Sequence, residues 1–471
     1  MSAPYLRTQP LPLPSSQRIP DDATMEHKYA PQTLPVYSAG ELSRNQFLCL
    51  WAAGIPIVLT QAQKKFQGHW DPGYFITHYG KLSVTPIDCE TDREAPRMAA
   101  SNFFALLLKR SDQQATLKLK DWPPKADFRT TFGRLDYGFF RSVPVECADM
   151  VCKGGIYNLA AHFPEGAVAP DLGPKLYIAM GAKGDTNGTT KLHLDVTCAI
   201  NIMMWSEDTT SRQPGAEWQI FPADSVDDLR SFLREEFSLS SDEDPIHQQH
   251  YYLSHLMLTR LREKYGVSPW TIYQYFGDIV LIPAGCPHQV RNLTHAIKAA
   301  CDFVSPQNLH RTINLAASLR THRIASGSGE DLLQLQALVW FGWLAMAAYA
   351  DGQTNLIWNI GDVGISEPNP DQGETSLQTI ATSPESSSNT AKRARKKAKI
   401  LPNLACRITC PFAGTCSMGG RLRSVLGTLD HLRDSHPEAY QKIDGPSLKE
   451  LRNTDDDHFV KKLLDLLGLR E

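Results

Sequence analysis

The segment GTTKLHLDVTCAINIMM, residues 188–204, decides the fold assignment because it joins two possible metal ligands to a long apolar run. His193 and Asp195 lie two residues apart, so an extended chain points both side chains to one face. The run AINIMMW (199–205) that follows is typical of a buried strand. The segment therefore predicts a ligand pair at the start of a β-sheet core.

A third candidate ligand is His288, in the sequence IPAGCPHQV. It follows the predicted strand DIVLIPA (278–284) and a turn rich in Pro and Gly, which would fix its direction. Two histidines and one carboxylate with open metal positions are the signature of non-haem iron(II) oxygenases. The alternative is coincidence, because His-x-Asp pairs are common and a lone histidine is usually a surface or core residue.

The part of the chain from 36 to 325 reads as globular, mainly β with interspersed helices. Short apolar or β-branched runs broken by Gly, Pro, Asn and Asp predict a barrel or a sandwich. The predicted strands include 55–60, 175–180, 199–205, 217–221, 278–284 and 296–304. Helical periodicity predicts helices over 224–237, over 250–265 ending at Gly266, and over about 329–350.

Composition defines the rest of the organisation. Hydrophobic residues make up 42% of the 471 residues and the net charge is -3, so no global basic field favours nucleic acid. We expect a disordered N-terminus (1–35), a helical extension (326–365) and a disordered linker (366–400). The start of the chain lacks a secretory signal, and the apolar run 337–350 is shorter than the roughly 20 residues of a membrane span. An intracellular, soluble protein with no membrane partner is the expectation.

The C-terminal part, 401–471, predicts a small zinc-finger-like α module. Cys410 and Cys416 are followed by His431 and His436 on a helix-like run, which suits tetrahedral zinc. The C-x5-C spacing is longer than usual, Cys406 is an alternative ligand, and a helical hairpin with free thiols is the alternative fold. Such a module could bind protein or contact DNA weakly.

A basic run, AKRARKKAKI (391–400), ends the linker. A nuclear-import signal is the favoured interpretation, because the run is short and lies between modules. The alternatives are a solvating tract or non-specific, salt-sensitive DNA affinity.

Residues 45–320 closely resemble the JmjC domain of the lysine demethylase 3 and hairless group. The matching stretches also have the same order and spacing as in that family. The matching stretches are LKLKDWPPKADF (117–128), YNLAAHFPEG (157–166), APDLGPKLYIAMG (169–181), GTTKLHLDVTCAINIMM (188–204), DPIHQQHYYL (244–253), LREKYGVSPWTIYQYFGDIVLIPAGCPHQVRNL (261–293) and IKAACDFVSPQNL (297–309). The resemblance implies a double-stranded β-helix, a jelly-roll or cupin-like barrel with flanking helices.

By position, the resemblance makes His193, Asp195 and His288 the iron ligands. It also implies 2-oxoglutarate as co-substrate, with Thr190 and Asn201 as candidate contacts.

Many JmjC enzymes bind the distal carboxylate of 2-oxoglutarate with a lysine, at a place held here by Ala216. A buried carboxylate needs a cation, and Lys298, ten residues after His288, is the candidate replacement. The alternative is that Lys298 is a solvated strand residue. Tyr177 matches a position that lines the methyl-lysine pocket of related enzymes, with barrel core as its alternative.

The resemblance implies an iron(II)- and 2-oxoglutarate-dependent histone lysine demethylase of the nucleus. Mono- and dimethylated lysine 9 of histone H3 is the implied substrate, and chromatin or transcription factors are the implied partners. Relatives carry a cysteine-rich zinc module before the JmjC domain, whereas here no cysteine precedes Cys49, so we expect targeting to be arranged differently. The competing hypotheses are a JmjC hydroxylase of a non-histone protein and a non-catalytic chromatin scaffold.

Overall fold

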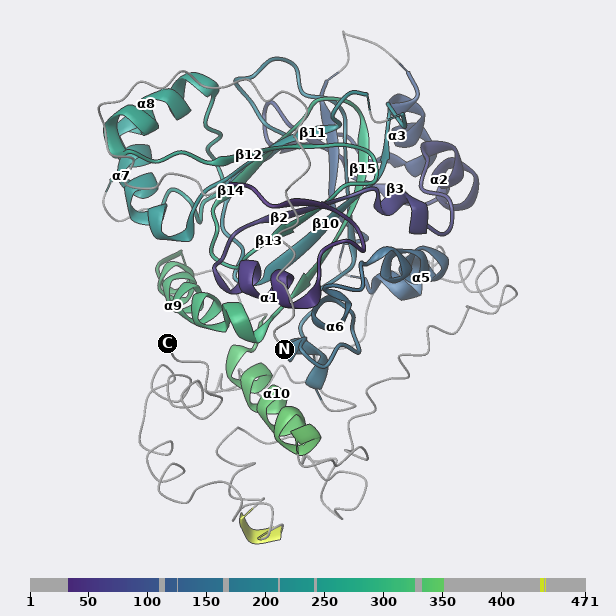
Figure 1. Cartoon of the computed structure of the whole chain (residues 1–471). Coiled ribbons are helices and arrows are strands. Elements are labelled where there is room, and N and C mark those ends of the chain that lie inside the picture. The colour runs from purple at the N-terminus through teal and green to yellow at the C-terminus, as the bar shows by residue number, and fades with distance from the viewer. Residues whose placement is uncertain are drawn as a thin grey trace, which may run out of the picture.

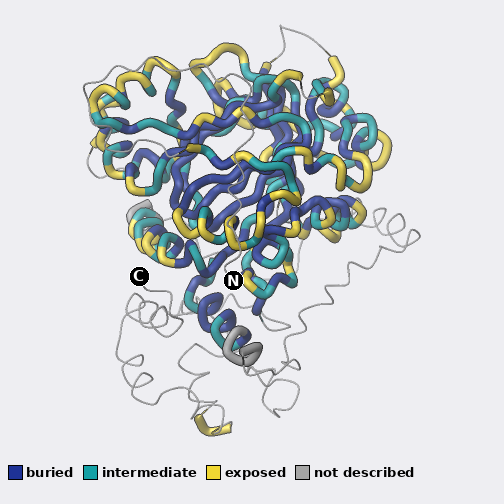
Figure 2. The backbone as a smooth tube through the Cα atoms, viewed as in Figure 1, coloured by how far each residue is buried: buried dark blue, intermediate teal, exposed yellow. Residues whose placement is uncertain are grey.

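A sandwich of two β-sheets forms the centre of the protein, and helices surround it (Figure 1). The computed structural model describes residues 33–109, 115–124, 126–163, 169–210, 212–240, 244–326, 333–350, 433–435 and 437. The strands of both sheets are mostly buried, whereas the outer turns of the helices are largely exposed (Figure 2). This is a cupin-like β-sandwich with flanking helices.

The larger sheet has nine strands in the order β1-β2-β13-β10-β15-β8-β7-β4-β5. Neighbours are antiparallel except β1 and β2, which run parallel. Its strands are β1 (Val36–Ser38), β2 (Ile57–Thr60), β4 (Ile87–Asp88), β5 (Arg93–Glu94), β7 (Leu117–Trp122), β8 (Lys175–Ala179), β10 (Cys198–Ser206), β13 (Ile279–Ile282) and β15 (Ala296–Phe303). Strands far apart in the sequence, such as β8, β10 and β15, are thus neighbours in space.

The smaller sheet has four antiparallel strands in the order β12-β11-β14-β9. They are β9 (Thr190–His193), β11 (Ala216–Ile220), β12 (Trp270–Gln274) and β14 (His288–Asn292). A separate pair joins β3 (Ser83–Val84) to β6 (Met98–Ala99). The two main sheets share an apolar core that includes Val58, Ala199, Met203, Trp218, Ile220, Ile272 and Val290.

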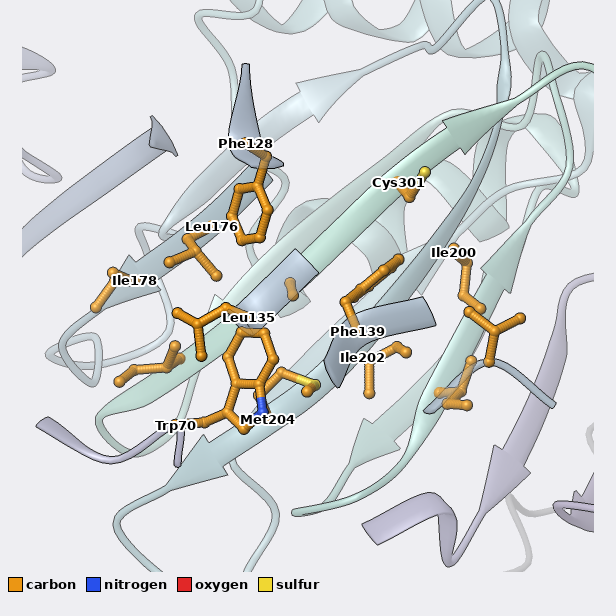
Figure 3. Packing of buried hydrophobic residues seen from close by; sticks show 14 of the residues in the cluster. Trp70, Phe128, Leu135, Phe139, Leu176, Ile178, Ile200, Ile202, Met204 and Cys301 are labelled. Carbon is orange, nitrogen blue, oxygen red and sulfur yellow. The ribbon is translucent and has the colours of Figure 1, made fainter. Parts of the chain in front are cut away.

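Strand alternation assigns the two faces of the large sheet. Along β10, Ala199 and Met203 belong to the core between the sheets, whereas Ile200 and Ile202 belong to a second core on the other side. The second core packs the sheet against helices from the N-terminal half of the domain. Figure 3 shows ring and aliphatic side chains of that core, among them Trp70, Phe128, Leu135, Phe139, Leu176, Ile178 and Met204.

Helices cover the outside of the sandwich. On the large-sheet side lie α1 (Arg44–Ala52), η1 (Ala62–Lys65), α2 (Pro72–Tyr79), α3 (Ala100–Leu107), α4 (Phe128–Thr131), α5 (Gly133–Ser142), α6 (Ala148–Val151) and η2 (Leu159–His162). The later helices are η3 (Ala223–Ser225), α7 (Val226–Phe237), α8 (His255–Tyr265), η4 (Pro306–Asn308), α9 (Leu309–Ser326) and α10 (Leu335–Ala350). Leu192 and Leu194 pack into a core with α7 and α8, which ties these helices to the strand that bears His193.

The strand and helix predictions are largely confirmed. All six quoted strand segments contain observed strands, and the helix predicted over 224–237 is α7 with η3 before it. The helix predicted from 250 starts only at His255, because Ser254 caps it by accepting from the Met257 amide. It ends at Gly266, which adopts a left-handed conformation with φ 65°, as predicted. No helix in the described ranges combines the length and apolar character needed to cross a bilayer.

The turn between β12 and β13 buries a carboxyl group. Asp278 is 6% exposed and accepts a hydrogen bond from the Tyr275 amide at 3.0 Å. Burial raises its pKa to about 7, and hydrogen bonds from the Tyr275 and Gln61 amides oppose the rise. The same turn positions Gln274, whose amide nitrogen donates to the Asp278 carbonyl oxygen.

We expect this carboxyl group to make folding less favourable as pH rises. Its pKa is higher in the folded state than in the unfolded state, so the folded protein binds this proton more tightly. The stabilisation from this group is therefore fully present below pH about 4. The free energy of unfolding should fall between about pH 4 and 7, by at most about 4 kcal/mol from this group. In Asp278→Asn, the free energy of unfolding should depend less on pH when it is measured by urea denaturation across that range. An unchanged pH profile would contradict the burial argument.

Candidate metal centre

Two histidines from neighbouring strands face each other at the edge of the small sheet. β9 and β14 pair antiparallel, and the register places His193 directly opposite His288. Their ring centroids lie 4.2 Å apart. Asp195 approaches both rings, with 3.8 Å between its Oδ1 and His193 Nε2 and 3.5 Å between its Oδ2 and His288 Nε2. One ligand atom from each of the three residues lies within 4.8 Å of the others.

The position of Asp195 does not come from β9 itself, since that strand ends at His193. Instead, the Asp195 carbonyl oxygen accepts a hydrogen bond of 3.1 Å from the Gly285 amide. Gly285 lies in the turn before β14 and has φ 79°, a conformation that favours glycine. The turn predicted from the Pro-Gly sequence thus fixes both His288 and Asp195.

Backbone carbonyls fix the protonation pattern of both imidazoles. His193 Nδ1–H donates to the Lys191 carbonyl oxygen at 2.8 Å, and His288 Nδ1–H donates to the Cys286 carbonyl oxygen at 3.0 Å. In a neutral ring, the Nε2 atom then carries a lone pair rather than a hydrogen. Burial, followed by the neighbouring His288, lowers the pKa of His193 to about 4, so this ring is neutral at physiological pH.

The donor set fits a divalent metal. Two Nε2 lone pairs and a carboxylate converge with no hydrogen between them, and this arrangement is electrostatically unfavourable unless a cation lies at the centre. Two imidazoles and one carboxylate suit iron(II) and leave coordination positions for other ligands. The residues predicted as ligands, His193, Asp195 and His288, are therefore brought together by the fold.

A buried cation lies on the same inter-sheet face. Lys298 is 4% exposed, and its Nζ donates to Asn292 Oδ1 at 2.7 Å. Its Nζ also lies 5.4 Å from the centre of the Trp218 ring. The same ring stacks against the imidazole of His288. Burial lowers the pKa of Lys298 to about 7. Lys298 is thus no solvated strand residue, and within the described ranges no carboxylate forms an ion pair with it.

Ala216 lies where the resemblance places a lysine in other enzymes. The β11–β14 register sets it opposite Asn292, the residue that binds Lys298. Lys298, on β15 of the large sheet, therefore reaches the space that a lysine side chain at position 216 would occupy. The arrangement fits the carboxylate of a small dianion such as 2-oxoglutarate.

Two polar residues beside Lys298 were not predicted from the sequence. Asn292 accepts the lysine hydrogen bond, and Thr189 Oγ1 donates to the Val290 carbonyl oxygen at 3.2 Å and to Asn292 Oδ1 at 3.4 Å. The predicted Thr190 is half-buried on β9 and pairs with Val290. The sequence gives little indication of Thr189 and Asn292, because only the pairing of β9 with β14 brings these two residues close to Lys298.

Asn201 belongs to a buried network between the sheets. Its Oδ1 accepts from Gln274 Nε2 at 3.3 Å, and Gln274 Oε1 accepts from Trp218 Nε1 at 2.9 Å. The β10–β15 register places Asn201 opposite Ala300, two residues from Lys298. The network holds the indole of Trp218 in place between Lys298 and His288.

Tyr177 on β8 points to the same inter-sheet face, because the register pairs it with Lys298. Its hydroxyl donates to Asp121 Oδ1 at 2.5 Å. Burial and then the charge of Asp121 raise the pKa of Tyr177 well above its ordinary value. Tyr177 therefore stays a neutral phenol on this face of the large sheet.

The zinc prediction falls outside the described residues. Cys406, Cys410, Cys416, His431 and His436 all lie there, as does the basic run 391–400. The zinc-binding and nuclear-import hypotheses stay predictions.

Residues 183–303, which hold the three candidate ligands, Asn201 and Lys298, match the family described as "JmjC domain, hydroxylase". This stretch is thus similar to a JmjC domain, and it contains the strands that bring the His-Asp-His centre together.

The particular relatives are lysine-specific demethylases. Lysine-specific demethylase 3A of Homo sapiens is 32% identical over 340 residues, which cover 63% of this chain and 26% of the relative. The chicken (Gallus gallus) protein of the same name is 32% identical over 64% of this chain and 26% of the relative. Lysine-specific demethylase 3 of Drosophila melanogaster is 32% identical over 63% of this chain and 40% of the relative. The chain is similar to these proteins and spans about a quarter to two fifths of their length.

We expect His193→Ala to abolish tight iron(II) binding, because it removes one of three protein ligands. The loss of affinity should exceed the roughly 10–100-fold typical of losing an outer-shell partner. Iron content after anaerobic loading and desalting, measured by mass spectrometry of the metal, checks this. His255→Ala is the matched control, since that ring lies half-exposed on α8 and bonds Glu217 instead. Equal iron retention in both variants would show that His193 is not a ligand.

Proposed function

We propose that this protein is an iron(II)- and 2-oxoglutarate-dependent histone lysine demethylase. The observation that carries the proposal is that His193, Asp195 and His288 share one inter-sheet face with a buried Lys298, which forms no ion pair with any residue that the structure describes. A metal centre alone would suit many enzymes. A metal centre beside a cation that lacks an anion is what a 2-oxoglutarate oxygenase requires.

The residues of the chain divide the work. His193, Asp195 and His288 would hold iron(II), with their Nδ1 hydrogen bonds fixing the ring orientation. Lys298, with Asn292 and Thr189, would bind the distal carboxylate of 2-oxoglutarate, while Asn201 and Thr190 are the further candidate contacts. With iron(II) and 2-oxoglutarate bound, dioxygen would be the oxidant: one of its oxygen atoms would convert 2-oxoglutarate to succinate and carbon dioxide, and the other would hydroxylate an N-methyl group, which would then leave as formaldehyde. The apolar walls around Trp218 exclude water from this chemistry.

The substrate proposal rests on the relatives. They are named lysine-specific demethylases, which supports a methylated lysine of a histone tail. The finer proposal is mono- or dimethylated lysine 9 of histone H3, with Tyr177 beside the methylated side chain. A nuclear location and chromatin or transcription-factor partners follow from such a substrate, and the basic run 391–400 is consistent with import.

A second function has one observation in its favour. The matched family is described as a hydroxylase, so a stable hydroxylation of a non-histone protein would use the same metal centre. A chromatin-binding scaffold without catalysis is the third possibility, and it predicts no succinate formation from 2-oxoglutarate.

Lys298→Met should weaken 2-oxoglutarate binding by about 10–100-fold, because a buried charged hydrogen bond contributes roughly 1.5–3 kcal/mol. Adding Ala216→Lys should restore part of the affinity by supplying a cation from β11. Titration calorimetry on iron-loaded protein kept free of oxygen measures both. Lys175→Met serves as control, since that amine is bound to Asp171 and two backbone carbonyls. Wild-type affinity in Lys298→Met would remove this residue from the co-substrate site.

The demethylase proposal is tested with a panel of methyl-lysine histone peptides, iron(II), ascorbate and 2-oxoglutarate. Peptide mass spectrometry should show loss of CH₂ units with matching succinate, and His193→Ala should abolish both. A stable gain of one oxygen atom would support the hydroxylase instead. If the iron-loaded wild-type protein forms no succinate, only the scaffold hypothesis remains.

A further inference from the structure

Gln274 makes a buried set of hydrogen bonds between the two sheets. It is the last residue of β12, is 0% exposed and reaches across to β10 of the large sheet. Its Oε1 accepts from Trp218 Nε1 at 2.9 Å. Its Nε2 donates to the Asp278 carbonyl oxygen at 3.1 Å, to the Asn201 carbonyl oxygen at 3.4 Å and to Asn201 Oδ1 at 3.3 Å. Both polar atoms of the Gln274 side chain therefore have partners.

These partners allow only one orientation of the Gln274 amide. The indole nitrogen of Trp218 can only donate, so the atom that faces it must be the oxygen of Gln274. The backbone carbonyl of Asp278 can only accept, so the atom that faces it must be the nitrogen. The Asn201 atom that meets this nitrogen must in turn be an acceptor, which makes it Oδ1 rather than Nδ2. The orientation of the first amide thus determines that of the second.

The fixed orientation directs the nitrogen of the Asn201 amide toward β15. In the large sheet, β10 lies between β13 and β15. Gln274 is bonded on the β13 side, at the Asp278 carbonyl just before that strand. Because Nδ2 diverges from Oδ1 in the planar amide, it faces the β15 side. Among the residues that the structure describes, none accepts a hydrogen bond from this nitrogen.

Lys298 lies on the side that the Asn201 nitrogen faces. The register pairs Asn201 with Ala300 and Met203 with Lys298, so Asn201 and Lys298 are diagonal neighbours on one face. Such neighbours lie roughly 7–8 Å apart, which lets two side chains contact one small anion between them. The Trp218 ring lies 5.4 Å from Lys298 Nζ, so the indole that bonds Gln274 also contacts the lysine. One charged and one neutral donor thus share a place that suits a carboxylate.

We propose that Gln274 is a positioning residue, which holds the Asn201 amide with its N–H groups toward Lys298 so that both side chains donate to the distal carboxylate of 2-oxoglutarate. This inference deepens the proposed function and rests on it. Without Gln274, the Asn201 amide could turn and present its oxygen, which repels a carboxylate. Gln274 thus acts through Asn201 rather than by its own contact with the co-substrate.

The test compares two anions that differ in the distal carboxylate. Oxalate has two carboxylates that can bind iron(II) but no distal group, whereas 2-oxoglutarate has one. Both are titrated by calorimetry into full-length protein loaded with iron(II) without oxygen, and the affinity for 2-oxoglutarate is divided by that for oxalate. Gln274→Met, which keeps the length but removes both polar atoms, should lower this affinity ratio about threefold or more. Gln274→Leu is the second variant should Gln274→Met not fold, as judged by circular dichroism.

The matched control is Gln219→Met. Gln219 is also a buried glutamine of the small sheet, 1% exposed, but it bonds Glu217 and Gln289. It is adjacent to Trp218 on β11, so its side chain points to the opposite face of the sheet. Its loss removes comparable buried hydrogen bonds, and the affinity ratio should stay at the wild-type value.

A double-mutant cycle tests whether Gln274 acts through Asn201. Asn201→Ala removes the donor itself and should lower the affinity ratio about tenfold. Gln274→Met should add little in that background, because the amide that it positions is already missing. An unchanged ratio in Asn201→Ala would overturn the inference whether or not the Gln274 variants fold.

The outcomes separate this inference from the proposed function. If the wild type binds 2-oxoglutarate and forms succinate but the Gln274 variants keep its affinity ratio, the positioning role is overturned and the proposed function stands. The same holds if Gln274→Met lowers the ratio equally with and without the Asn201 side chain, or if Gln219→Met lowers it as much. If the iron-loaded wild type does not bind 2-oxoglutarate at all, both proposals fail.

Discussion

The metal centre depends on one antiparallel pairing, that of β9 with β14, which sets His193 directly opposite His288. A shift of one residue would turn one imidazole to the opposite face of the sheet, toward α7 and α8. The register is anchored by apolar side chains on both faces, with Leu192 packed against the helices and Val290 between the sheets. The hydrophobic cores on the two sides of the small sheet thus determine the geometry of the ligands.

Much of this arrangement could be predicted from the sequence. The strands were recognisable because their apolar runs are long and bounded by turn residues, and the ligand pair lies within three residues. His288 required the turn chemistry of Pro283 and Gly285 and the family resemblance. The position of Asp195 just beyond the strand depends on the Gly285 amide, so strand alternation alone gives an incomplete reason for its direction.

The groups around Lys298 could not be derived in that way. Asn292 lies six residues before it, which means nothing until β14 and β15 are placed in facing sheets. Thr189 and Thr190 are adjacent in the sequence, and the bulge between β9 and β14 decides which hydroxyl reaches Asn292. Tertiary pairing, rather than local pattern, creates these contacts.

The inter-sheet face of β15 carries one basic and one acidic side chain. Lys298 and Asp302 are four residues apart, about 13 Å along an extended strand. At that distance their mutual attraction in a partly buried site is only about 1 kcal/mol, far less than the cost of burying either charge alone. Lys298 therefore needs a counter-charge from outside the described part of the chain, which is an anion bound beside it. The distal carboxylate of the proposed co-substrate would supply that counter-charge at Lys298.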